Sequence, residues 1–155
     1  MYSSQGDAVR EWLEGYRREE SELDELIDRV RELRGSVTSI RAQEITDMPK
    51  GKGSDDPLCD YVIQLERLEG NMERRLELHE RDREALVDLT RKIKRKEDKE
   101  VIKCRYLFGM EWAEIRFRIY GRQKEYAVHQ ERYDRRMYRA HNRAIEWMGK
   151  NWSIK

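Results

Sequence analysis

The chain has 155 residues, of which 42% are charged and 37% are hydrophobic, and it contains two prolines. This length suits one domain, or one small domain with an extended element, and the composition favours long charged helices over a large apolar core. The opposite charges nearly cancel, to a net of +1, and the apolar residues are regularly spaced, which argues against a chain that is disordered throughout. No run of about 18 apolar residues is present, so a membrane span is not expected.

The two parts of the chain carry opposite charge. Residues 1–90 contain 14 Lys and Arg against 23 Asp and Glu, a net of −9, whereas residues 91–155 contain 19 against 9, a net of +10. A basic segment suits a polyanion, because each phosphate that it neutralises releases bound counterions. The split therefore predicts two different roles for the acidic front and the basic back.

Apolar residues recur at alternating steps of three and four in the first part of the chain. The series is Val9, Trp12, Tyr16, Leu23, Leu26, Val30, Leu33, Val37 and Ile40. Glu19 interrupts it. This heptad seam predicts one helix over residues 7–44, after a frayed start at residues 1–6.

A second seam follows a segment with Pro49, Gly51 and Gly53, which predicts a loop over residues 45–56. The apolar members of this seam, within a helix expected over residues 57–92, are Leu58, Tyr61, Leu65, Leu68, Met72, Leu86, Leu89 and Ile93. Its polar interruptions are Arg75, His79 and Asp82. Two long helices with a short loop predict an antiparallel coiled-coil hairpin over residues 1–95, and the seam also allows a homodimer.

Residues 96–149 have the pattern of a helix-turn-helix unit, which makes the expected fold class all-α. A helix over residues 97–108 is expected to end at Gly109, where a turn needs positive φ. The next helix places Trp112, Ile115 and Ile119 on one face and ends at Gly121.

The connection over residues 122–131 is longer than the roughly three or four residues usual in this motif. A final helix is expected over residues 132–149, with residues 150–155 as a frayed tail. The predicted buried stripe of that helix is Tyr133, Met137, Ala140, Ala144, Ile145 and Met148.

Arginines fill much of the exposed side of this final helix. A guanidinium can fork onto a guanine edge or clamp a phosphate. Arg135, Arg136 and Arg139, near the helix start, are predicted to read base edges of double-stranded DNA. The predicted phosphate contacts are Arg132, Arg143, Lys94, Arg95 and Lys96. A solvated basic helix without a ligand is the alternative interpretation.

A motif in this region is similar to one in a known family. Arg105-Tyr106, Gly109, Trp112 and Glu114-Ile115, followed by Arg143-Ala144-Ile145, resemble the fourth conserved region of bacterial sigma factors. The chain departs from that pattern in the long connection before the final helix and in Arg116, where an alanine is usual.

Within that superfamily the chain looks most like phage-encoded late transcriptional regulators of the RinA and ArpU type, in which a loop such as Thr46-Asp47-Met48-Pro49 separates two long helices. The resemblance implies a sequence-specific regulator that binds promoter DNA and activates phage late genes in the bacterial host cell. Bacterial RNA polymerase is the protein partner that it implies.

No pattern for catalysis, a cofactor or a metal is present, so we expect no enzyme. His79, His129 and His141 lack the ligand spacing of a zinc site and are expected to be surface or DNA-facing residues. The isolated Cys59 and Cys104, with a polar N-terminus, favour a reducing, cytoplasmic location.

Two other functions fit the same features. A phage DNA-packaging recognition subunit, like a small terminase, also joins a helix-turn-helix to a coiled coil. A protein-interaction or inhibitor module could instead use the acidic helical hairpin as a DNA mimic. A molecular mass in solution that corresponds to a ring of subunits would favour the packaging subunit. Tight binding to another protein, without affinity for DNA, would favour the interaction module.

Overall fold

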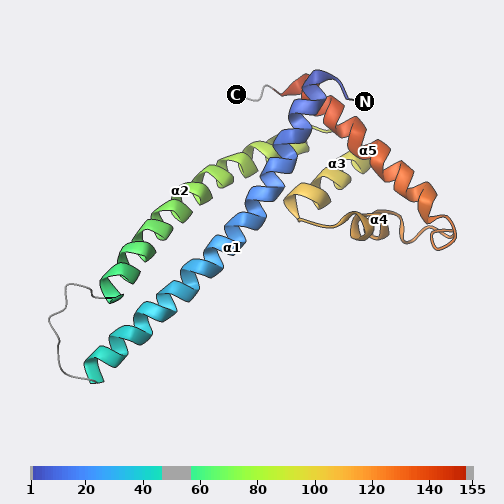
Figure 1. Ribbon diagram of the computed structural model, residues 1–155. Coiled ribbons are helices and arrows are strands. Elements are labelled where there is room, and N and C mark those ends of the chain that lie inside the picture. The colour runs from blue at the N-terminus through green and yellow to red at the C-terminus, as the bar shows by residue number, and fades with distance from the viewer. Residues whose placement is uncertain (1, 47–56, 153–155) are drawn as a thin grey trace. The chain divides into compact units, whose positions relative to one another are not determined.

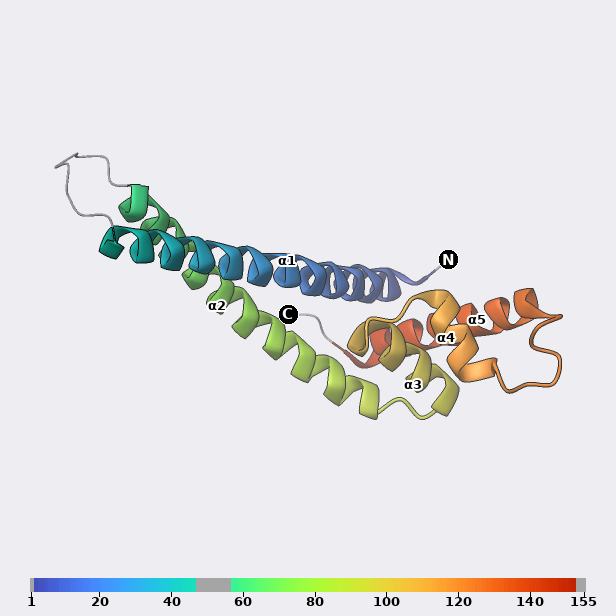
Figure 2. The same cartoon turned by 90° about the horizontal axis from the view of Figure 1, so that it is seen from below.

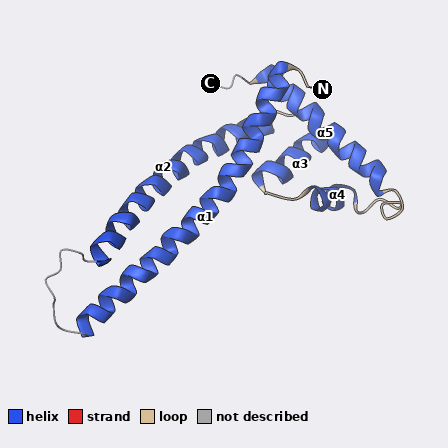
Figure 3. Cartoon of the chain, in the orientation of Figure 1, coloured by secondary structure: helices blue, strands red, loops and turns tan. Residues whose placement is uncertain are grey.

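The computed structural model describes residues 2–46 and 57–152, which form helices and no strand (Figure 3). This confirms the all-α prediction. The elements are α1 (Ser4–Thr46), α2 (Pro57–Arg91), α3 (Lys96–Ile102), the π-helical turn η1 (Lys103–Leu107), α4 (Trp112–Tyr120) and α5 (Gln130–Asn151). Most of the loop predicted over residues 45–56 lies outside the described residues.

The described residues group into two compact units. The two-helix unit is Glu19–Glu80, and the head unit combines Met1–Arg18 with Arg81–Lys155. The division therefore does not fall between residues 95 and 96, where the sequence pattern placed it. It falls where the seams become polar, at Glu19 in α1 and beyond Arg75 in α2, because an apolar core cannot continue through those positions.

In the two-helix unit, α1 and α2 run side by side in opposite directions (Figure 1). Its core is Leu23, Leu26 and Val30 of α1, with Leu65, Leu68 and Met72 of α2 packed against it. All six residues belong to the predicted seams. The seam residues therefore pair within the chain in this unit.

Glu19 and Arg75, one polar interruption from each seam, meet in the two-helix unit. Arg75 donates from Nε and Nη2 to the two carboxylate oxygens of Glu19, at 2.7 and 2.9 Å, and from Nη2 to Glu22 at 3.0 Å. The hydrogen bond from Arg75 lowers the pKa of Glu19. A forked pair of this kind satisfies both charges where the apolar seam is broken.

Arg75→Ala is expected to lower the free energy of unfolding of the two-helix unit by up to about 1 kcal/mol, because Glu19 then lacks its partner within the seam. Replacing both residues by Leu should restore the stability or raise it, since an apolar pair continues the seam. Urea unfolding followed by circular dichroism measures both effects. Arg34→Ala, which breaks the more exposed pair with Glu69, is the control and should change stability by less than about 0.5 kcal/mol. Equal losses in the two single variants would contradict the prediction.

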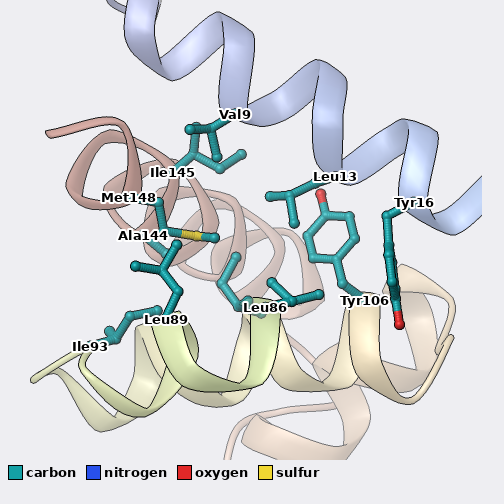
Figure 4. Close-up of a cluster of buried hydrophobic side chains, with 11 residues drawn as sticks. Val9, Leu13, Tyr16, Leu86, Leu89, Ile93, Tyr106, Ala144, Ile145 and Met148 are labelled. Atoms are coloured by element: carbon teal, nitrogen blue, oxygen red, sulfur yellow. The ribbon is translucent and has the colours of Figure 1, made fainter. Parts of the chain in front are cut away.

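The main core of the head unit brings distant parts of the chain together (Figure 4). Its buried members are Val9, Leu13 and Tyr16 of α1, Leu86 and Leu89 of α2, Ile93, Ile102, Tyr106, and Ala144, Ile145 and Met148 of α5. Leu13 is fully buried although the predicted seam passed through its neighbour Trp12, which lies at the edge of the core. The first turns of α1 are thus a structural part of the head.

A second core joins α3, η1, α4 and α5, which lie beside one another in both views (Figures 1 and 2). Its buried members are Val101, Cys104, Ile115, Tyr120, Met137 and Ala140. Gly109 follows η1 with a φ of 66°, as its position between two helices predicted. All six residues predicted for the buried stripe of the final helix are buried or half-buried.

Both predicted frayed ends are wrong within the described residues. Ser3 donates from its backbone N–H and its hydroxyl to the Glu146 carboxylate, at 2.8 and 2.9 Å, and α1 begins at the next residue. At the other end, α5 continues to Asn151. Gly149 lets α1 approach α5 closely, because a Cβ there would lie 3.0 Å from the backbone N of Gly6. These contacts join residues that are far apart in the sequence. They hold both ends of the described chain in place.

Candidate nucleic-acid interface

The outer face of α5 carries three arginines that are free of acidic partners. Arg132, Arg135 and Arg139 are exposed and lie three and four residues apart, so they share one side of the helix. The structure gives none of them an ion pair among the described residues. Arg135 donates only to the backbone carbonyl of Glu131 four residues earlier, at 3.4 Å. This row is available for an anionic partner.

The other two arginines of α5 bind carboxylates of α3. Arg136 donates to both oxygens of Glu97, at 3.0 and 3.2 Å, and its guanidinium lies 5.3 Å from the centre of the Tyr120 ring. Arg143 donates to the buried Asp98, with a shortest distance of 2.8 Å. Both contacts join α5 to α3, which gives these two arginines a structural role in the head.

The carboxylate of Glu97 is held in its charged form by its neighbours. Burial of the side chain opposes ionisation, but hydrogen bonds from Arg136 and from the Tyr120 hydroxyl outweigh it, so the pKa of Glu97 is lowered. Burial, together with the hydrogen bond to this carboxylate, raises the pKa of Tyr120. Arg136 would have to leave this network before it could read a base.

A groove of about 830 Å³ lies between α5, the connection from α2 to α3 and the first residues of the chain. Lys94, Arg95, Arg139 and Lys150 line it, and none of the four has an ion pair within the described part of the chain. The two carboxylates in its lining, Asp98 and Glu146, already accept hydrogen bonds from Arg143 and Ser3. The rim of the groove is therefore cationic, which suits phosphate groups.

The structure brings together four of the eight predicted DNA-contacting residues. Arg139, Arg143, Lys94 and Arg95 line this groove, whereas Arg132, Arg135, Arg136 and Lys96 do not. Sequence reasoning missed Lys150, because it expected the helix to end one residue earlier. The signal was present: Arg139, Arg143, Glu146 and Lys150 follow one another at steps of four, three and four, the spacing of one helix face.

A buried pair behind α5 fixes the helix to η1. The Tyr106 hydroxyl lies 2.7 Å from Nε2 of His141, and both side chains are buried. Burial lowers the pKa of His141 to about 4 and raises that of Tyr106, so a neutral imidazole and a protonated hydroxyl share a hydrogen bond at neutral pH. The prediction that His141 is a surface or DNA-facing residue is wrong, because its ring is on the inner side of α5.

The motif around Arg105 and Trp112 supports the turn before α4. The Arg105 guanidinium lies 4.3 Å from the centre of the Trp112 ring and donates to the Met110 carbonyl at 3.2 Å. Arg17 of α1 donates to Glu111 at 2.7 Å. Trp112 in turn packs edge-on against His141, with ring centroids 5.0 Å apart. These residues therefore have a structural role as a bridge from α1 to α5.

Among residues 2–46 and 57–152, no group of three or more His, Cys, Asp and Glu side chains is placed to hold a metal ion. In the same residues, no helix has the length and apolar content needed to cross a membrane. Comparison of the chain with models of protein families, with curated proteins and with solved structures finds no match.

Proposed function

We propose that this protein is a sequence-specific, double-stranded-DNA-binding transcription regulator that reads DNA with α5. The observation that carries the proposal is the row of Arg132, Arg135 and Arg139, which are exposed and have no acidic partner among residues 2–46 and 57–152, on a helix whose opposite side is fixed in the head. A helix of this kind fits the major groove, where guanidiniums can reach guanine edges. Lys94, Arg95 and Lys150 at the groove add phosphate contacts.

Arg135 and Arg139 are the base readers that this proposal favours. Arg132, Lys94, Arg95 and Lys150 would bind the DNA backbone, and Arg143 supports α5 through Asp98. Arg136 stays a candidate base reader only in a bound state that releases Glu97. By its resemblance to sigma region 4 and to late phage regulators, the protein would act at phage late promoters, with RNA polymerase as a partner of the acidic two-helix unit.

Arg139→Ala is expected to weaken binding to the preferred duplex by roughly 1–3 kcal/mol and to relax preference at one base position. The preferred duplex would first be selected from a random pool at a stated salt concentration. Binding of selected and scrambled duplexes is then measured by fluorescence anisotropy. Arg139→Lys keeps the charge but loses the two parallel N–H donors of the guanidinium. This variant should therefore recover phosphate binding but not the base preference.

Arg31→Ala in the two-helix unit is the matched control, since Arg31 is an exposed arginine distant in sequence from α5. It removes the same charge and should leave duplex affinity unchanged. If Arg135→Ala, Arg136→Ala and Arg139→Ala all bind like the native chain, α5 is not the reading element and the proposal fails.

A further inference from the structure

The segment between α4 and α5 is longer than a helix-turn-helix turn, and it forms a series of hydrogen-bonded turns. We call residues 121–129 the connection arm (Figure 1). Backbone hydrogen bonds run along it, from the N–H of Gln123 to the Tyr120 carbonyl at 3.0 Å and from the N–H of Tyr126 to the Gln123 carbonyl at 3.1 Å. Its last residue, His129, donates to the Glu125 carbonyl at 3.0 Å.

Arg116 of α4 joins the connection arm to α5. It donates from Nε to the Tyr126 hydroxyl at 3.0 Å and from Nη1 to both oxygens of Asp134, at 2.8 and 2.9 Å. Its side chain is only 19% exposed, so the contact is partly shielded from solvent. The two departures from the sigma-like pattern, the unusual arginine and the long connection, are therefore parts of one structure.

Aromatic packing fixes the arm further. The Tyr126 ring packs edge-on against Phe117 of α4, with centroids 6.0 Å apart, and lies 5.8 Å from the Tyr133 ring of α5. Tyr133 in turn stacks on Tyr120 at 5.2 Å. The arm is thus bound to both flanking helices and presents its remaining side chains from a fixed base.

Two of the remaining side chains, Arg122 and Lys124, are cationic and exposed. Neither of these two has an ion pair within the described part of the chain. The one carboxylate of the arm, on Glu125, lies 3.4 Å from Nε2 of His129. Val128 is 79% exposed. The arm therefore carries two exposed cations against one carboxylate, and Arg116 pairs with the nearby Asp134, which together favour an anionic partner.

We propose that the connection arm is a second DNA-contacting surface, in which Arg122 and Lys124 bind phosphates that flank the segment read by α5. This inference rests on the proposed function, since it takes α5 as the helix in the major groove. Recognition helices touch bases with their N-terminal residues. The arm leads directly into those residues: the helical rise of about 1.5 Å per residue puts Arg132 and Arg135 within about 10 Å of it along the axis.

The test is the double variant Arg122→Ala/Lys124→Ala, whose side chains are exposed, so that the fold should be unaffected. Affinity is measured by fluorescence anisotropy over a series of salt concentrations, on the selected duplex and on one shortened at the flanks. We expect roughly ten-fold weaker binding to both selected and unrelated duplexes, and a salt slope smaller by about 1.8, because two phosphate contacts are lost. The native chain should lose affinity on the shortened duplex, whereas the variant should not.

The matched control is Arg29→Ala/Arg31→Ala in the two-helix unit, which removes the same charge from exposed positions. A second variant, Arg116→Ala, keeps both arm cations but releases the arm, and it should weaken binding three-fold or more. If Arg135→Ala weakens binding while the arm variant keeps the native affinity and salt slope, the arm inference is overturned and the proposed function stands. If the native chain binds no duplex, both the proposed function and the arm inference are overturned.

Discussion

Lowering the pH from 7 to 4 is expected to destabilise the head unit by about 3 kcal/mol through one residue, His141. Burial lowers the pKa of this imidazole from its ordinary value of 6.5 to about 4. Between those pH values the unfolded chain binds a proton that the folded chain excludes. The free energy of unfolding therefore falls as the pH falls through this window. The stability that the neutral His141 contributes to the head unit is fully present above pH 6.5.

The measurement is urea unfolding at several pH values, followed by tryptophan fluorescence. All four tryptophans (Trp12, Trp112, Trp147 and Trp152) belong to the head unit, so their signal reports this unit. Carboxylates with a lowered pKa, such as Glu97, begin to cost stability only when the pH falls below their ordinary pKa of 4.5. The loss of stability between pH 6.5 and 4.5 is therefore attributed to His141.

His141→Gln is the control for this prediction. The amide oxygen can still accept the Tyr106 hydrogen bond, but the side chain does not titrate. Its stability should be nearly constant between pH 6.5 and 4.5. If the stability of this variant falls equally steeply with pH, another group causes the pH dependence. The imidazole would then not be buried as the structure places it.

Leu13→Ala is expected to lower the free energy of unfolding of the head by about 2–5 kcal/mol. The side chain is fully buried between helices from both ends of the chain, so its removal takes apolar area out of the core and leaves a cavity. Tryptophan fluorescence during urea unfolding again measures the effect. A loss this large would be a substantial share of the stability of a domain this size.

The control for Leu13 is Leu78→Ala in α2. Leu78 is 59% exposed, and its truncation should change stability by less than about 0.5 kcal/mol. If Leu13→Ala were equally harmless, the first turns of α1 would not be part of the head core. The head would then be formed by the later residues alone, with the boundary at residue 95 that the sequence pattern suggested.

The periodic seams predicted the helices well, because helix position depends on local spacing of apolar residues. The predicted bounds 7–44 and 57–92 differ from α1 and α2 by three residues at most. The seams could not show which of the hydrophobic cores each stretch of a helix packs into. Leu65 packs in the two-helix unit and Leu86 in the head unit, although both belong to the second seam. Only the polar positions, Glu19 in the first seam and Arg75, His79 and Asp82 in the second, marked the change.

The candidate site was predictable as a set of charges but not as a set of pairings. Sequence spacing placed five arginines on one helix. It could not show that Glu97 and Asp98, more than thirty residues earlier, would bind Arg136 and Arg143. It also had no signal that Arg116 would meet Tyr126 across the connection arm. Such contacts depend on how separate helices pack, which a one-dimensional pattern does not contain.

The distance in sequence between the partners in the head has a consequence for synthesis on the ribosome. Tyr2 hydrogen-bonds to Asn142, and Ser3 to Glu146, across 140 and 143 positions. At translation rates of roughly 5–20 residues per second, the first turns of α1 wait on the order of ten seconds for α5 to emerge. During that interval Val9, Leu13 and Tyr16 form an uncovered apolar stripe on the nascent chain, which makes it a candidate for chaperone binding until translation supplies the missing helix.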